Sequence, residues 1–368
     1  MKRYSSLVGR IACSMLVVAP LALGQQQATS ATDERLAGYL KRFPAADANA
    51  DGVLTRPEAK AFHAKRSRQQ KGGGKARKGL TPTEADVRYG DHPRNVLDWF
   101  RAESDVPTPV LIFFHGGGFV AGDKQKGATQ PVSRQCLESG ISVVSANYRF
   151  VRQGRDGAPA EPFPGPMLDG ARVVQFVRSK AVDWNIDPRR IALSGGSAGA
   201  VMSMWIALHD EMADPENQDP ILRHSTRVST VVAYSGPTTL DPAVILKHVG
   251  GRPDVHPSLI PFYGVETMND LQQPAKQALV QQASPLNMVS DDDPPLYPKY
   301  GGAIGEAPLP ADASHGKSIH HPMFGKLMRD AYDELGLVCH VVCRDSPAKM
   351  DELAFLKAVF KKPEAVRE

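Results

Sequence analysis

The chain has 368 residues, of which 42% are hydrophobic, and its formal net charge at pH 7 is +4. An apolar fraction of this size excludes a disordered chain, and the length suffices for one large core with a smaller module. The excess of basic residues lies in one segment, residues 60–78, so the rest of the chain gives no indication of specific nucleic-acid binding.

Residues 1–24 have the pattern of a secretory signal peptide. Basic residues precede the apolar stretch IACSMLVVAPLALG, which ends on small residues of the kind that a signal peptidase cleaves. The stretch is shorter than the ~20 residues of a membrane-spanning helix. We therefore expect a secreted or periplasmic protein. Its remaining cysteines, which we expect to be buried thiols, are Cys136, Cys339 and Cys343.

Residues 31–64 form a small module around the loop DANADGVLTRPE, residues 47–58. Oxygen donors recur at the spacing that a Ca²⁺ ion requires, and Gly52 stands at the sharp turn. The expected ligands are Asp47, Asn49, Asp51, the Val53 carbonyl and Glu58. This pattern resembles an EF-hand, although an Asp/Asn-rich turn without metal remains the alternative. Because we find no second loop to pair with it, we expect weak Ca²⁺ binding and a structural or docking role.

Residues 65–81 are predicted to be a basic flexible linker, because they contain Gly72–Gly74 and almost no apolar side chains. The linker serves as a soluble spacer, or else it makes a weak contact with an anionic polymer or lipid surface.

Residues 82–363 alternate apolar, strand-like runs with amphipathic, helical ones. Strand and helix in turn predict an α/β fold with a mostly parallel sheet and helices on both faces. Ligands of such sheets lie beyond the carboxyl ends of the strands. The predicted strands are 110–115, 142–148, 190–195, 228–236, 294–301 and 338–342, and the predicted helices are 129–138, 167–180, one from Ser197, 324–336 and 351–362.

Two glycine-rich turns follow predicted strands. In GGSAG, Gly195 and Gly199 flank Ser197, as in a strand-to-helix turn that exposes a nucleophilic serine. Upstream, HGGGF at residues 115–119 offers bare backbone N–H groups that can stabilise an oxyanion, and the N–H of Ala198 adds another. The pair indicates a hydrolase site.

With DVRYGDHPRNVLDWF, HGGGFVAGDK, SANYRF and RIALSGGSAG, residues 86–236 resemble the α/β-hydrolase superfamily. The resemblance is to its HGGG-bearing esterase branch, which includes hormone-sensitive-lipase-like and bacterial feruloyl-esterase-like enzymes. It implies a small-molecule or carbohydrate-linked carboxylic ester as substrate and no cofactor for the chemistry. It also implies Ser197 as nucleophile, Gly116, Gly117 and Ala198 as oxyanion donors, and a structural role for His115.

The acid and base of the triad lie outside these motifs. The resemblance implies an acid after the penultimate core strand, where Glu306 and Asp312 stand, and a histidine after the last strand. No histidine follows His340. The loop SHGKSIHHPMFG, residues 314–325, holds the remaining candidates, and we take His321 as base, with His320 as alternative, and Glu306 as acid. If neither histidine reaches Ser197, the chain is a non-catalytic binding protein of hydrolase fold.

Overall fold

The computed structural model describes residues 29–62, 79–153 and 157–361. The predicted signal peptide and most of the predicted linker lie outside these residues. The chain divides between Arg77 and Lys78 into two compact units, a boundary inside the segment predicted as linker. Among the described residues, no helix is both long and apolar enough to cross a membrane.

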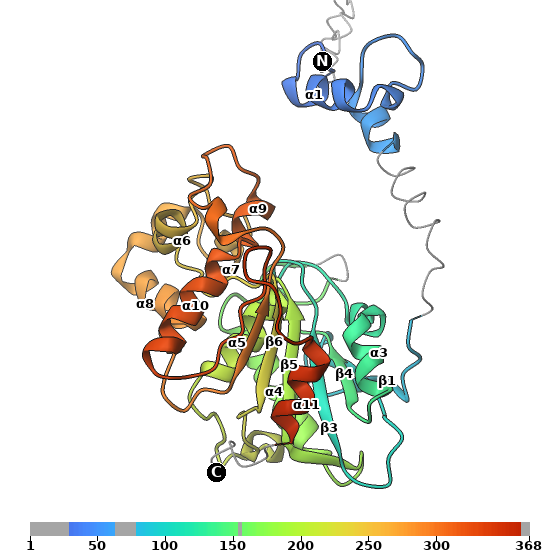
Figure 1. Ribbon diagram of the computed structural model, residues 1–368, viewed down its shortest axis with the longest axis vertical. Coiled ribbons are helices and arrows are strands. Elements are labelled where there is room, and N and C mark those ends of the chain that lie inside the picture. Colours follow the sequence, from blue (N-terminus) through green and yellow to red (C-terminus); the bar gives the residue numbers. More distant parts are fainter. Residues whose placement is uncertain (1–28, 63–78, 154–156, 362–368) are drawn as a thin grey trace, which may run out of the picture. The chain divides into compact units, whose positions relative to one another are not determined.

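The larger unit is built on a sheet of seven described strands in the order β1-β2-β4-β3-β5-β6-β7 (Figure 1). The strands β4, β3, β5, β6 and β7 pair in parallel, whereas β2 pairs antiparallel with both β1 and β4. The predicted α/β-hydrolase fold is thereby confirmed. The bounds are β1 Glu84–Arg88, β2 Val96–Phe100, β3 Thr108–Phe114, β4 Ser142–Ala146, β5 Ile186–Gly196, β6 Thr230–Tyr234 and β7 Leu296–Lys299.

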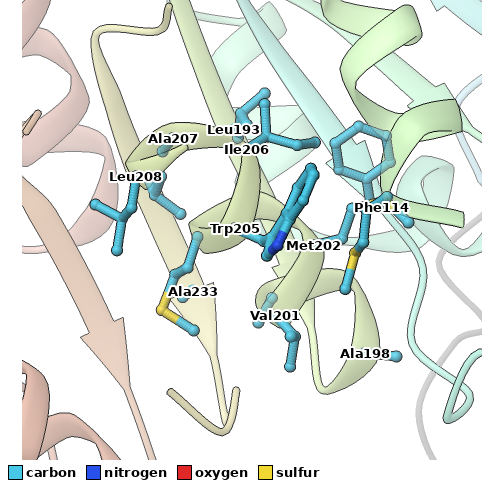
Figure 2. Packing of buried hydrophobic residues seen from close by; sticks show 14 of the residues in the cluster. Phe114, Leu193, Ala198, Val201, Met202, Trp205, Ile206, Ala207, Leu208 and Ala233 are labelled. Atoms are coloured by element: carbon cyan, nitrogen blue, oxygen red, sulfur yellow. The ribbon is translucent and has the colours of Figure 1, made fainter. Parts of the chain in front are cut away.

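Helices cover both faces of the sheet, because alternate residues of each strand point to opposite sides. Phe114 of β3 belongs to the larger core cluster with α4 and α5, whereas Leu111 of the same strand packs with α3 and α11. All residues of α5 are buried, and Figure 2 shows Met202, Trp205 and Ile206 of this helix packed beside Phe114 and Leu193. The helices are α3 Pro131–Leu137, α4 Gly165–Ser179, α5 Ala198–Leu208, α6 Pro242–His248, α7 Leu259–Tyr263, α8 Pro274–Ala283, α9 His315–Ile319, α10 Met323–Glu334 and α11 Glu352–Phe360.

Three parts of the larger unit differ from the sequence-based expectation. The antiparallel strands β1 and β2 were not predicted. The predicted strand 338–342 makes only isolated parallel bridges to β7, at Leu296–Cys339 and Lys299–Val342. Residues 239–290, for which we predicted no structure, contain α6, α7 and α8. The three described cysteines are buried free thiols, as expected, and burial raises the pKa of Cys136 to about 12.

The smaller unit is a pair of short helices around the predicted Ca²⁺ loop. Helix α1 spans Glu34–Arg42, a 3₁₀ turn follows at Pro44–Ala46, and residues 56–62 are helical again. A small core, built from both helices and the loop, holds the unit together. Its buried members are Leu36, Ala46 and Leu54, with Tyr39, Leu40, Phe43, Ala59 and Phe62 packed against them.

Candidate active site

Ser197 occupies a strained turn between β5 and α5. Its backbone has φ 54° and ψ −118°, a conformation that residues with a Cβ rarely adopt. Its N–H donates to the carbonyl of Tyr234 at 2.8 Å, which ties the turn to the end of β6. A Cβ on Gly199 would approach the Phe114 carbonyl closer than 3.0 Å, and one on Gly195 would meet Gly199 equally closely. The two glycines are therefore required by close backbone packing, and they leave the serine at the carboxyl end of the sheet.

The glycine loop after β3 faces this serine. Gly117 and Gly118 have φ +129° and +61°, and a Cβ on Gly117 would collide with the Ala121 carbonyl, so only glycine fits. In the part of the chain that the structure describes, the N–H groups of Gly116 and Gly117 donate to no backbone carbonyl. Ala198 is the first residue of α5, where a helix leaves its N–H groups unpaired. All three residues line the same cavity as Ser197.

His115 packs against the glycine loop and holds it in place. It is fully buried, its ring stacks on Tyr148 with centroids 4.3 Å apart, and its Nδ1 lies 3.0 Å from the carbonyl oxygen of Gly116. The Tyr148 hydroxyl donates to the carbonyl of His115 at 2.7 Å. Burial lowers the pKa of His115 to about 4, so its ring is neutral at pH 7. These contacts fix the loop and place no proton acceptor near the serine.

The structure places His320 beside Ser197, with its Nε2 2.9 Å from the serine Oγ. Our choice of His321 is corrected by this geometry. His321 is 2% exposed, its Nδ1 accepts the N–H of Met323 at 3.1 Å, and its Nε2 is buried without a partner. His320 is the C-cap of α9 and His321 follows it, so the end of this helix directs the first ring to the serine while the second ring is buried elsewhere.

The structure does not bring the predicted acid, Glu306, to His320. Glu306 forms ion pairs with Lys317 and Arg344, which lower its pKa, and the other candidate, Asp312, is exposed. Among the described residues, no carboxylate hydrogen-bonds His320. Burial lowers the pKa of His320, and the Gly316 hydrogen bond opposes that effect less strongly.

Ser197 opens into a cavity of about 680 Å³. Its apolar end belongs to the larger core cluster, whereas its polar end includes Tyr234, which packs against the smaller cluster on the other face of the sheet. The apolar end is lined by Phe119, Val201, Leu240, Leu259, Phe262 and Ile319, and the polar end by Lys126, Gln130 and Tyr234 beside Phe113. His256 and Ser258 also reach the cavity. Sequence reasoning missed most of this wall, because residues 239–290 carry no motif and only their tertiary packing brings Leu240, Leu259 and Phe262 to the serine.

A parallel sheet whose central strand ends in a strained serine, opposite a glycine loop from the neighbouring strand, defines an α/β-hydrolase of the esterase branch. Within that class the chain belongs to the BD-FAE family, whose model matches residues 97–302.

The curated relatives carry esterase names. The chain is 30% identical over 224 residues to the probable carboxylic ester hydrolase LipM of Mycobacterium tuberculosis. This alignment covers 59% of the chain and 47% of LipM. It is 28% identical over 221 residues to esterase LipQ of the same organism, covering 59% of this chain and 48% of LipQ. The chain thus spans about half the length of these relatives.

Solved structures share the fold. An acetyl ester-xyloside bifunctional hydrolase from Caldicellulosiruptor lactoaceticus aligns with TM-score 0.56 and 21% identity, over 77% of this chain and 97% of that one. A truncated carbohydrate esterase from gut microbiota aligns with TM-score 0.59 and 19% identity, over 80% of this chain and 100% of that one. At these identities the likeness shows the fold alone.

The predicted Ca²⁺ loop of the smaller unit has a turn of the expected shape. Gly52 has φ +82° and donates its N–H to Asp47 Oδ2 at 2.8 Å, and Asp51 Oδ1 accepts the N–H of Val53 at 2.8 Å. Asp47 Oδ1 is buried and has no hydrogen-bond partner, as expected of an oxygen reserved for a cation. The carboxylate of Glu58, however, accepts the N–H and hydroxyl of Thr55.

Among the expected side-chain ligands, Asp47 keeps an oxygen without a partner, whereas Asn49 and Asp51 hydrogen-bond within the loop. Glu58 would have to turn away from Thr55 to reach a cation. In keeping with this, no group of three or more His, Cys, Asp or Glu in the described residues is assembled to hold a metal. The residues before α1 occupy the edge of the loop. Ser30 donates its N–H to the Leu54 carbonyl at 2.8 Å, and its Oγ accepts the Leu54 N–H at 2.8 Å. That edge is where a second loop of a pair would otherwise bind.

Proposed function

We propose that this chain is an exported serine esterase that hydrolyses a small-molecule or carbohydrate-linked carboxylic ester through Ser197 and His320. The observation that carries the proposal is the 2.9 Å separation of His320 Nε2 from Ser197 Oγ, opposite the glycine loop. The names of the curated relatives support the ester class. The N-terminal sequence pattern supports export.

In the first step, His320 Nε2 takes the proton of Ser197 as Oγ attacks the ester carbonyl carbon. The carbonyl oxygen becomes an oxyanion, which accepts hydrogen bonds from the N–H groups of Gly116, Gly117 and Ala198. The tetrahedral intermediate collapses, the bond to the alcohol oxygen breaks, and His320 returns its proton to that oxygen. Water then repeats the sequence on the acyl-serine, which releases the acid and restores both side chains.

The Gly316 carbonyl takes the place of a triad carboxylate. When Nε2 accepts from Ser197, Nδ1 is the nitrogen available to donate to Gly316, which favours the neutral tautomer needed for proton abstraction. A carbonyl carries no net charge, so it stabilises the imidazolium of the transition state less than a carboxylate does. We therefore expect a working but slower esterase than one with a complete triad.

The alternative, a binding protein of hydrolase fold, depended on the lack of a base. The His320–Ser197 contact favours the esterase, because both groups are in position for proton transfer.

We expect a fluorophosphonate probe to label the wild-type protein at one residue, because the probe reacts with serines that a neighbouring base activates. Ser197→Ala should abolish labelling, and His320→Ala should slow it strongly. Ser203→Ala is the control, since Ser203 is buried and donates to the Gly199 carbonyl at 2.8 Å. A folded wild-type protein that stays unlabelled would support the binding-protein alternative instead.

We also propose that the smaller unit binds one Ca²⁺ through Asp47, Asn49, Asp51, the Val53 carbonyl and Glu58. The buried, unpartnered Oδ1 of Asp47 supports the site. Because the residues before α1 already satisfy the loop edge, the unit does not need a second loop. Turning Glu58 away from Thr55 opposes binding, which is consistent with a weak site of structural or docking role.

Titration calorimetry of the full chain should show one Ca²⁺ site with a dissociation constant on the order of 10⁻⁴–10⁻³ M. Asp47→Ala and Glu58→Gln should remove it, because each takes away a charged oxygen ligand. Asp33→Asn is a suitable control, since Asp33 belongs to the same unit but lies outside the loop and pairs with Arg56. Unchanged Ca²⁺ binding in both ligand variants would show that this loop is a turn without metal.

A further inference from the structure

The polar end of the active-site cavity is lined by side chains that can donate hydrogen bonds. It is formed where β3, the 3₁₀ turn Lys124–Thr129, the start of α3 and the end of β6 meet, and it contributes Lys126, Gln130 and Tyr234. Phe113 lies beneath the turn, since a Cβ on Gly127 would contact its ring at 3.1 Å. The apolar end is built by other elements, so the two ends can bind different parts of one substrate.

The charge along the wall is of one sign. Lys126 is the ammonium group among the lining residues, and no Asp or Glu lines the cavity. The pKa values of His256 and His320 are lowered by burial, so both rings are neutral at pH 7. Within the described residues Lys126 forms no ion pair, although the neighbouring Lys124 pairs with Asp86 and Asp98. Among the described residues, Lys126 is thus an exposed cation that lines the cavity and has no carboxylate partner.

Two uncharged polar side chains, Gln130 and Tyr234, line the cavity together with Lys126. Gln130 donates its Nε2 to the Lys126 carbonyl at 3.2 Å, which holds the amide beside the turn. Burial, and after it the charge of Glu352, raises the pKa of Tyr234, so the phenol stays protonated. Its hydroxyl makes no hydrogen bond within the described part of the chain, and it can donate to a ligand. The nearby Glu352 pairs with Lys299 and does not line the cavity, so an ammonium and a phenol donor are left to match a singly charged, oxygen-bearing group.

We propose that Lys126, together with Tyr234 and Gln130, forms a subsite for a carboxylate carried by the ester substrate. The inference rests on the proposed esterase function and adds the substrate's charge to it. The carboxylate belongs either to the acyl part or to the alcohol part, and matched substrates distinguish the two. Because Lys126 is exposed, its contribution is that of a solvated ion pair, on the order of a fivefold preference.

The test compares esters that differ only in charge. One pair, 4-acetoxybenzoate and 4-acetoxybenzamide, carries the difference on the alcohol. The other, the 4-nitrophenyl monoesters of adipic acid and of its monoamide, carries it on the acyl group. In one pair, wild type should favour the carboxylate in kcat/KM. Lys126→Met should reduce that ratio about fivefold, chiefly through a higher KM for the charged ester. Lys126→Arg should retain the preference, and added salt should weaken it.

Lys247→Met serves as the matched control, because Lys247 is an exposed lysine of α6 that does not line the cavity. If the neutral esters are hydrolysed and neither ratio depends on Lys126, the subsite is wrong while the esterase function stands. If no ester is hydrolysed, the esterase function fails, and calorimetry with 4-hydroxybenzoate and adipate monoamide against their neutral amides decides the subsite. Equal affinity for charged and neutral ligands, or no effect of Lys126→Met on either charged ligand, then overturns it.

Discussion

Replacing His320 by alanine should lower the turnover of a short-chain aryl ester by about 10³-fold, because Ser197 loses the group that takes its proton. The oxyanion donors remain, so a residual rate persists. His321→Asn is the matched control. It removes the neighbouring imidazole but keeps an acceptor for the Met323 N–H, and the rate should change by less than about threefold. Steady-state kinetics, with circular dichroism to check folding, measures both variants.

The pH profile gives a second measure of the same base. Only neutral His320 accepts a proton, so kcat/KM should fall as pH is lowered through the His320 pKa. Burial places that pKa below its ordinary value of 6.5, so the fall should occur below pH 6.5. His256 lies close enough to His320 for their charges to interact, and His256→Gln separates its titration from the profile. Equal rates in His320→Ala and wild type would remove His320 from the mechanism.

Replacing Gly199 by alanine should destabilise the protein by about 3 kcal/mol, although alanine is the better helix former. The new Cβ would lie closer than 3.0 Å to the carbonyl groups of Phe114 and His115, and backbone on both sides leaves it no room to move. The loss is measured as a shift of the urea unfolding midpoint at constant slope.

Gly196→Ala provides the comparison within the same turn. There the nearest atom to the new Cβ is the Tyr234 carbonyl oxygen at 3.9 Å, which is ordinary contact, so stability should change by less than about 0.5 kcal/mol. Equal unfolding midpoints for Gly199→Ala and Gly196→Ala would show that close packing of the turn does not explain the glycine.

The sequence by itself determined the features that depend on local backbone geometry. The turn around Ser197 and the loop at Gly116–Gly118 are readable because glycine alone fits where a Cβ would meet backbone. The strands β3 to β7 and the helices α3, α4 and α5 are readable because an apolar run in a buried parallel strand and an apolar helix face leave periodic patterns. These patterns predicted an α/β fold with a mostly parallel sheet, and the resemblance of residues 86–236 implied the α/β-hydrolase fold.

Only the tertiary structure decided which side chains meet across the cavity. His320 and His321 are adjacent in sequence and chemically identical, and the orientation of α9 relative to Ser197 separates them. Glu306 stands where an acid was expected, but Lys317 and Arg344 hold its carboxylate elsewhere. Which histidine and which carboxylate reach the site depends on contacts between residues far apart in the chain, such as Ser197 and His320. It also depends on which ion pairs each charged group forms. Neither produces a periodic pattern in the sequence.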